Sequence, residues 1–163
     1  MTSFDLRIGQ GIDVHSFGGA GPIMLGGVVI ECEVGLTGHS DADVLLHAIV
    51  DALLGACGKP DIGARYPDTD PRLKGADSLV FLEEVWKEIE SSGWEIVNID
   101  CTILAQKPKI APHVGAIKNR ISAVLNVDPE QIGIKATTTE TLGFVGREEG
   151  IVASCVALIK KVA

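Results

Sequence analysis

The sequence predicts an α+β sandwich, in which helices cover one face of a β-sheet. Three patterns support this class: short apolar runs near both ends of the chain, one alternating run in the middle, and helical segments that do not separate every pair of strands. A doubly wound parallel sheet fits less well, because it requires a helix between each strand and the next. With 163 residues the chain is short for two domains, so we treat residues 1–163 as a single domain.

The first elements are expected to be strands. The apolar pattern of residues 6–14 predicts a strand that ends before the glycine-rich segment 18–22. Residues 23–25 and 28–32 predict two short strands on either side of Gly26 and Gly27. Together these two strands would form a small N-terminal hairpin.

The central part of the chain predicts a buried helix followed by a long loop. The helix extends from Ser40, a good N-cap, to about Cys57, with Asp41 and Asp43 in its first turn. It is apolar almost all round, which is typical of a helix that is buried on most of its surface. Residues 60–75 are rich in Pro, Asp, Gly and Arg and predict a long loop, a kind of segment that is often functional in compact domains.

The C-terminal half adds two helices and three strands. Asp77 can cap a helix that ends before Gly93, and a second helix is expected to begin near Pro112. Residues 96–105 predict a half-buried strand, because apolar and polar side chains alternate there. Its buried face would consist of Val97, Ile99, Cys101 and Ile103. Two more strands follow at residues 132–137 and 151–159, and the last is apolar on both faces.

The composition argues against several classes of protein. The chain has 14 Lys and Arg residues against 22 Asp and Glu residues, and this net charge of −8 argues against broad nucleic-acid binding. No run approaches the roughly 18 apolar residues that cross a bilayer, and the first residues lack a secretory leader pattern. We therefore expect a cytoplasmic protein with no nucleic-acid or membrane partner. The four cysteines are isolated and form no CxxC pair, so we expect buried thiols rather than disulfides.

The segment Gly11-Ile12-Asp13-Val14-His15 places a carboxylate and an imidazole on one face of the first strand. Positions two apart in a strand point to the same side, so Asp13 and His15 can share a metal ion such as zinc. A polar pair at the edge of the sheet, without an ion, is the alternative interpretation.

The predicted central helix carries a narrow polar stripe. Asp43, His47 and Asp51 are spaced four residues apart, and no Lys or Glu accompanies them as on a solvated face. His47 is therefore a candidate third ligand beside Asp13 and His15, and a hydrogen-bonded core histidine is the alternative. Three protein ligands leave one tetrahedral position for substrate, the pattern of catalytic zinc. Asp51 could then orient the His47 imidazole.

Two further segments carry groups that suit phosphate. His39 and Ser40 lie at the N-terminus of the central helix, where free N–H groups and the helix dipole favour anions. Residues 135–144 offer threonine hydroxyls and the carboxylate of Glu140, a combination that suits phosphates together with Mg²⁺ or Mn²⁺. A Thr-rich strand followed by a Gly turn is the alternative for this segment.

Two loops complete the set of candidates. Residues 105–112 form a loop stiffened by two prolines, whose backbone groups could recognise the edges of a base. In the long loop, Asp61 and Asp68 add carboxylates. Solvated turn aspartates are the alternative for these two.

Taken together, these motifs resemble the 2-C-methyl-D-erythritol 2,4-cyclodiphosphate synthase family of the non-mevalonate isoprenoid pathway. The resemblance extends over about residues 7–160. It rests on G-x-D-x-H ending at His15, HSDADVLLHAIVDALLGA from His39, DIG from Asp61, AQKPK, and KATTTETLGF with GREEG. Tyr66 stands where the family often has Phe, a departure that leaves the chemistry unaffected.

The resemblance implies a homotrimer with active sites between neighbouring subunits. Each protomer would be a ferredoxin-like sandwich with helices on one face of a mixed sheet and a small N-terminal hairpin. Zinc would be held by Asp13, His15 and His47. A Mg²⁺ or Mn²⁺ ion would be held by Glu140 together with the substrate diphosphate.

The resemblance also implies roles for the other matched residues. His39, Thr138 and Glu140 match catalytic positions. Phe144 and Arg147 match the lining of a central channel in the trimer, where an isoprenoid diphosphate can bind. The matched substrate-binding positions are His39, Ser40, Asp61, Gly63, Asp68, Ala105, Pro108, Lys109, Ile110, Ala136, Thr137, Thr138, Phe144 and Arg147.

The reaction that the resemblance implies is an intramolecular phosphoryl transfer, of the phosphorus–oxygen lyase type. The substrate would be 4-diphosphocytidyl-2-C-methyl-D-erythritol 2-phosphate, which cyclises with release of CMP. One alternative is a zinc-dependent phosphohydrolase that activates water at the open metal position. Another is a non-catalytic trimer that binds an isoprenoid phosphate or a nucleotide and whose metal is structural.

Overall fold

A mixed five-stranded sheet forms the centre of the computed structural model, which describes residues 5–162. Its strands are β1 (Leu6–Ala20), β4 (Val34–Leu36), β5 (Trp94–Leu104), β6 (Ile132–Thr137) and β7 (Gly150–Lys161). They are arranged in the order β4-β1-β7-β5-β6, and only the β5–β6 pair is parallel. The predicted hairpin is also present, as β2 (Ile23–Leu25) and β3 (Val28–Ile30).

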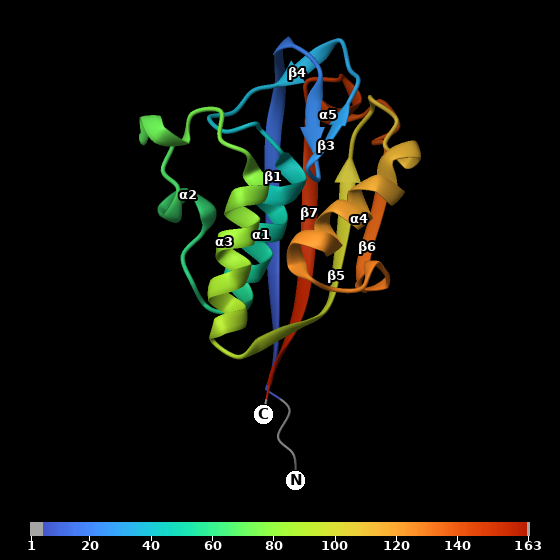
Figure 1. Ribbon diagram of the computed structural model, residues 1–163. Coiled ribbons are helices and arrows are strands. Elements are labelled where there is room, and N and C mark those ends of the chain that lie inside the picture. Colours follow the sequence, from blue (N-terminus) through green and yellow to red (C-terminus); the bar gives the residue numbers. More distant parts are fainter. Residues whose placement is uncertain (1–4, 163) are drawn as a thin grey trace.

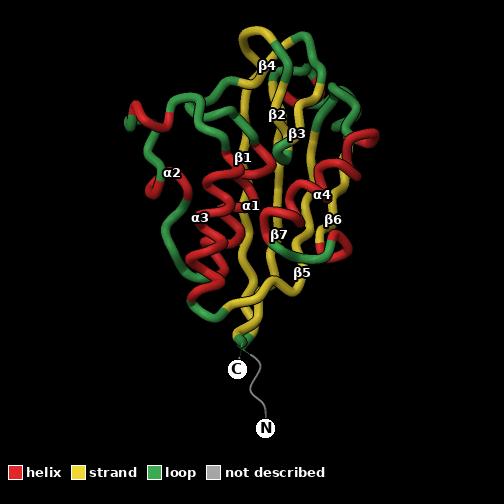
Figure 2. The backbone as a smooth tube through the Cα atoms, in the orientation of Figure 1, coloured by secondary structure: helices red, strands yellow, loops and turns green. Residues whose placement is uncertain are grey.

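The three long helices cover one face of this sheet (Figure 1). They are α1 (Val44–Ala56), α3 (Ser78–Ser91) and α4 (Val114–Leu125). The short helices α2 (Ile62–Arg65) and α5 (Gly143–Gly146) lie outside this layer. Figure 2 shows that the chain on both sides of α2 is loop. This arrangement confirms the α+β class with helices on one face. Within residues 5–162, no helix has the length and apolar character needed to cross a membrane.

Helix α1 packs directly onto β1 because two glycines let the backbones approach. A Cβ atom at Gly9 would lie 1.8 Å from the carbonyl oxygen of Ala52, and one at Gly11 would lie 2.0 Å from that of Ala48. Any side chain at either position would therefore separate the two elements. This close contact brings the turn of α1 that contains His47 next to the part of β1 that follows Gly11.

The opposite face of the sheet is apolar, and none of the three long helices covers it. Ile8, Ile12, Val14 and Val156 are exposed there, with Ile8 at 71% and Ile12 at 59%. Strand β7 buries Ile151, Ala153, Cys155, Ala157 and Ile159 against the helices and has Val152, Val156 and Leu158 on its other face. The prediction that this strand is apolar on both faces is therefore confirmed.

Several predicted boundaries are wrong for identifiable reasons. Strand β1 continues to Ala20, because its last residues pair with β4, a strand too short to be recognised from its sequence. Helix α1 begins at Val44 with Asp43 rather than Ser40 as its N-cap. A register shift between Ile96 and Asn98 leaves Val97 only half-buried, while Ile96 takes its place in the core.

Other expectations are confirmed. Asp77 caps α3 by accepting the N–H of Leu79, and β6 occupies the residues predicted for it. All four cysteines are free; Cys101 and Cys155 are buried, whereas the other two are half-buried. The first four residues, where the sequence lacks a leader pattern, lie outside the described residues.

Candidate active site

Asp13, His15 and His47 meet at one point between β1 and α1. Asp13 and His15 project from the same face of β1, as their spacing predicts, and His47 lies in the first turn of α1. The Asp13 Oδ2 atom lies 2.9 Å from His15 Nε2 and 3.0 Å from His47 Nδ1. The two histidine nitrogens are 3.1 Å apart. The predicted triad is therefore present, with one potential ligand atom from each residue.

This donor set fits a tetrahedral metal ion. Ligands at zinc lie about 2.0–2.2 Å from the ion, which places neighbouring ligand atoms roughly 3.3 Å apart in a tetrahedron. The three atoms here lie within 4.8 Å of one another and need little movement to reach that spacing. One carboxylate oxygen and two imidazole nitrogens are ligands that zinc accepts, and three protein ligands leave a position free.

The nitrogen that His15 offers to a metal is fixed by its other nitrogen. His15 Nδ1 lies 2.7 Å from the backbone carbonyl oxygen of Thr37, which can only accept a hydrogen bond. Nδ1 must therefore carry the hydrogen and donate it. A neutral His15 consequently presents a lone pair on Nε2, the atom that faces Asp13 and His47.

The electrostatics of the triad favour an ionised carboxylate. Burial alone would raise the pKa of Asp13, but its hydrogen bonds with His15 and His47 outweigh burial and hold that pKa well below its usual range. Burial alone would lower the pKa of His15, whereas its hydrogen bonds with Asp13 and Thr37 raise it above the ordinary value. The triad thus holds an ionised Asp13 carboxylate beside the imidazole rings of His15 and His47.

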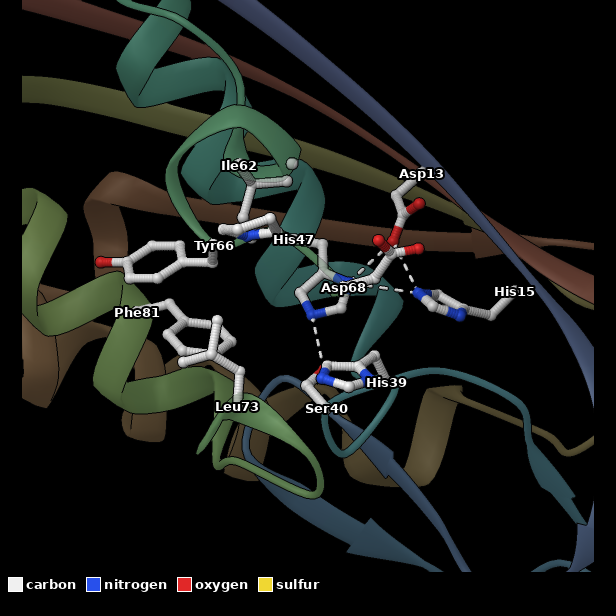
Figure 3. A pocket seen from close by; sticks show the side chains of 12 residues that line it. Asp13, His15, His39, Ser40, His47, Ile62, Tyr66, Asp68, Leu73 and Phe81 are labelled. Carbon is white, nitrogen blue, oxygen red and sulfur yellow. Dashed lines mark hydrogen bonds and ion pairs between the residues drawn. The ribbon is translucent and has the colours of Figure 1, made fainter. Parts of the chain in front are cut away.

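A cavity of about 510 Å³ opens in front of the triad. Its walls include His39, Ser40, Gly63 and Asp68, which the sequence analysis had selected. Figure 3 shows the triad on one side of this cavity, with the aromatic rings of Tyr66 and Phe81 on the other. These two rings stack with their centroids 4.3 Å apart. One wall of the cavity is therefore polar and carries the three potential metal ligands, and the opposite wall is apolar.

The polar stripe predicted on α1 does not face the cavity as a unit. Asp43 is fully buried and points away, toward the β2–β3 turn, where its carboxylate accepts the N–H groups of Gly26 and Gly27. Asp51 was predicted to orient His47, and that prediction is wrong. Asp51 Oδ1 instead accepts the N–H of Ile62 at 2.7 Å and holds the first turn of α2.

The predicted base-recognition loop lines a separate cavity of about 230 Å³. This cavity is formed where β5 and β6 end, and Ala105 N–H donates to the carbonyl of Thr137 there at 3.0 Å. The structure brings together seven of the predicted substrate-binding residues at this place: Ala105, Pro108, Lys109, Ile110, Ala136, Thr137 and Thr138. Asp61 lines neither cavity; its carboxylate caps α2 by accepting the N–H of Ala64.

Glu140 lies in a turn directly after β6. Thr138 Oγ1 donates to Glu140 Oε1 at 3.1 Å. Glu140 and Thr141 both have positive φ angles, 53° and 67°, a conformation that costs a residue with a side chain about 1–3 kcal/mol and is concentrated at functional sites. Phe144 and Arg147 lie exposed in and after α5.

Sequence reasoning missed several residues of the site. Tyr66, Leu73 and Phe81 line the cavity, but on their own they are apolar residues in loop and helix patterns. Ser78 is fully buried with its hydroxyl 2.9 Å from His47 Nε2. A serine directly after a helix cap gives no signal of such a contact in the sequence.

Comparison with known proteins points to one family. The model of the YgbB family matches residues 6–160. A protein of Lysinibacillus sphaericus named 2-C-methyl-D-erythritol 2,4-cyclodiphosphate synthase is 55% identical over 155 residues, which are 95% of this chain and 98% of the relative. A protein of the same name from Bacillus cytotoxicus is 56% identical over the same shares of both chains.

Solved structures have the same fold. An IspF–CDP complex from Plasmodium falciparum matches with a TM-score of 0.86 and 36% identity over 97% of each chain. A bifunctional IspDF protein from Campylobacter jejuni matches with a TM-score of 0.94 and 43% identity. The match covers 98% of this chain and 43% of that one, so this chain spans less than half of the bifunctional protein.

Proposed function

The chain belongs to the YgbB family, and from that premise we propose how its cavities perform the reaction of a 2-C-methyl-D-erythritol 2,4-cyclodiphosphate synthase. The chain has the function for which its curated relatives are named, that of a cyclodiphosphate synthase of isoprenoid biosynthesis. The observation that carries the proposed mechanism is the meeting of Asp13, His15 and His47 in the wall of the large cavity.

The reaction is an intramolecular phosphoryl transfer on 4-diphosphocytidyl-2-C-methyl-D-erythritol 2-phosphate. An oxygen of the 2-phosphate forms a bond to the β-phosphorus, and the bond from that phosphorus to the oxygen of CMP breaks. CMP leaves with the electron pair, so the step is a phosphorus–oxygen lyase reaction. The attacking oxygen is already anionic, so the protein must mainly align two anions and offset their repulsion.

The residues of the large cavity would hold the phosphates and the methylerythritol. Asp13, His15 and His47 would hold Zn²⁺, which supplies Lewis-acid stabilisation of the phosphate charge when bound. His39 and Ser40 lie beside the triad and would contact phosphate oxygens. Tyr66 and Phe81 line the opposite side and would shield the substrate from water there.

The residues of the smaller cavity would hold the cytidine. Ala105, Pro108 and Ile110 offer backbone groups to the base, and Thr137 and Thr138 offer hydroxyls. Glu140 next to Thr138 would hold Mg²⁺ or Mn²⁺ together with the substrate diphosphate. The CDP that is bound to the Plasmodium falciparum relative supports a cytidine diphosphate-linked substrate.

We further propose a homotrimer with its active sites between subunits. The triad of Asp13, His15 and His47 and the loop of residues 105–112 line two separate cavities of one chain. This separation supports a site that a neighbouring copy of the chain completes. The uncovered apolar face of β1 and β7 supports burial by association. Phe144, 41% exposed, and Arg147 would line a central channel that can hold an isoprenoid diphosphate. A single ferredoxin-like domain and a cytoplasmic location are part of the same proposal.

A zinc-dependent phosphohydrolase is not favoured, because the curated relatives are named synthases. Incubation of the purified protein with the cytidylylated substrate, with and without chelator, tests the proposal. We expect CMP together with a cyclic diphosphate, and loss of both with chelator. Linear phosphates, or a cyclic product that is unaffected by chelator, would contradict it.

A further inference from the structure

We propose that Ser78 and Asp41 are positioning residues that determine which ring nitrogen of His47 is free to bind a metal. The proposal rests on the proposed function in one respect, that the triad binds a metal ion. It concerns residues that no motif in the sequence had indicated for this role.

The three side chains form a chain of hydrogen bonds that leads away from the cavity. Ser78 Oγ lies 2.9 Å from His47 Nε2, on the side of the ring opposite to Asp13. The Ser78 hydroxyl donates to Asp41 Oδ1 at 2.5 Å, and the Ser78 backbone N–H donates to Asp41 Oδ2 at 3.1 Å. Both carboxylate oxygens of Asp41 thus accept a hydrogen bond from Ser78.

Counting hydrogens along this chain assigns the tautomer of His47. An ionised Asp41 can only accept, so the single hydroxyl hydrogen of Ser78 is directed to it. Ser78 Oγ then has only lone pairs left for His47, so the contact between them requires Nε2 to donate its hydrogen. A neutral His47 that donates to Ser78 has its lone pair on Nδ1, the atom that would bind a metal beside Asp13 and His15. A hydrogen bond from Nδ1 to Asp13 requires a second hydrogen on the ring, and a metal at Nδ1 takes the place of that hydrogen.

Several features keep this relay in place. Ser78 is fully buried and is the first residue of α3, so its position is set by the helix. Asp41 lies where a negative charge is favoured, at the N-terminus of α3. Ser40 Oγ also lies 3.1 Å from His47 Nε2 and 3.3 Å from Ser78 Oγ. The assignment requires the Ser40 hydroxyl to donate to the second lone pair of Ser78 and not to Nε2.

The relay resembles the outer hydrogen bonds that orient histidine ligands of metals. Loss of such a bond typically lowers metal affinity about 10–100-fold. We expect Ser78→Ala to weaken binding of Zn²⁺ by that factor. The wild-type cavity residues would all remain in the variant, so the loss would come from the orientation of His47 alone.

The test measures zinc affinity of the purified protein by competition with a chromogenic chelator. Ser122→Ala is the matched control, because Ser122 is also a buried helical serine but donates only to the backbone of its own helix, at Asn119. We expect Ser78→Ala to lose 10–100-fold and Ser122→Ala to stay within twofold of wild type. Equal affinities of the two variants would overturn the proposal.

Two further readouts separate positioning from a merely structural role. In ¹⁵N-labelled, zinc-loaded protein, the hydrogen of His47 should be found on Nε2 and protected from solvent exchange, and Ser78→Ala should remove this protection while Ser122→Ala does not. In a double-mutant cycle, Asp41→Ala and Ser78→Ala should not be additive, because both act through one hydroxyl. Additive effects, or a hydrogen on Nδ1, would contradict the relay. Absence of zinc binding by the wild type would instead refute the proposed metal site.

Discussion

Replacement of Gly11 by alanine should separate the two elements that carry the triad. A Cβ atom there would lie 2.0 Å from the carbonyl oxygen of Ala48, whereas ordinary contact begins at 3.4 Å. Because that oxygen belongs to the main chain of α1, no side-chain rotation can relieve the clash, and the backbones must move apart by roughly 1.4 Å. Metal sites tolerate deviations of only about 0.2 Å, so His47 on α1 would no longer share an ion with Asp13 on β1.

Both stability and metal binding should therefore fall in Gly11→Ala. Overpacking a well-packed core costs about 1–3 kcal/mol and occasionally more, and a clash between two backbones belongs at the upper end. We expect the free energy of unfolding to fall by about 3 kcal/mol and zinc affinity to fall more than 100-fold, beyond the effect of losing one outer hydrogen bond. Urea denaturation of the metal-free protein gives the first quantity, and chelator competition gives the second.

Gly115→Ala is the matched control for this variant. Gly115 lies in α4, and a Cβ atom there would meet nothing within 4 Å. We expect unchanged zinc affinity and a free energy of unfolding that is unchanged or raised by up to about 1 kcal/mol. If Gly11→Ala bound zinc as tightly as Gly115→Ala, the close packing of α1 on β1 would not be what positions the triad.

Three further substitutions probe the groups around the triad. Asp43→Asn should place a side-chain N–H group opposite a backbone N–H group that now donates to the carboxylate. We expect the free energy of unfolding, measured in urea, to fall by about 1–3 kcal/mol. A variant as stable as the wild type would contradict the buried contacts of Asp43. Asp51→Ala should release the N–H of Ile62 and raise KM several-fold while zinc affinity stays unchanged, and an unaltered KM would show that this contact does not position α2. Glu140→Ala should keep zinc but lose the response of activity to Mg²⁺ or Mn²⁺; a response like that of the wild type would exclude Glu140 as the ligand of the second ion.

The parts of the fold that follow local rules could be predicted from the sequence. Asp77 followed by a helical apolar pattern predicted α3, and Pro112 followed by such a pattern predicted α4. Asp13 and His15 could be paired because alternate residues of a strand share a face. His47 could be added to them because it is a polar residue on a helix that is otherwise apolar.

The features that depend on distant partners could not be predicted. Asp43 replaces Ser40 as the N-cap because the N–H groups of Gly26 and Gly27 are presented to it by another part of the chain. Strand β4 is defined by its pairing with β1, because its three residues are too few to show a strand pattern of their own. Ser78 likewise reaches His47 only through the packing of α3 against α1.

The central claim is that Asp13, His15 and His47 hold one metal ion on which cyclisation depends. Substitution of His47 by alanine, with zinc content and CMP release measured on the same preparation, tests it most directly. We expect both to be lost together while circular dichroism shows a folded protein. A folded, zinc-free His47→Ala protein that still releases CMP and forms the cyclic diphosphate would contradict the claim.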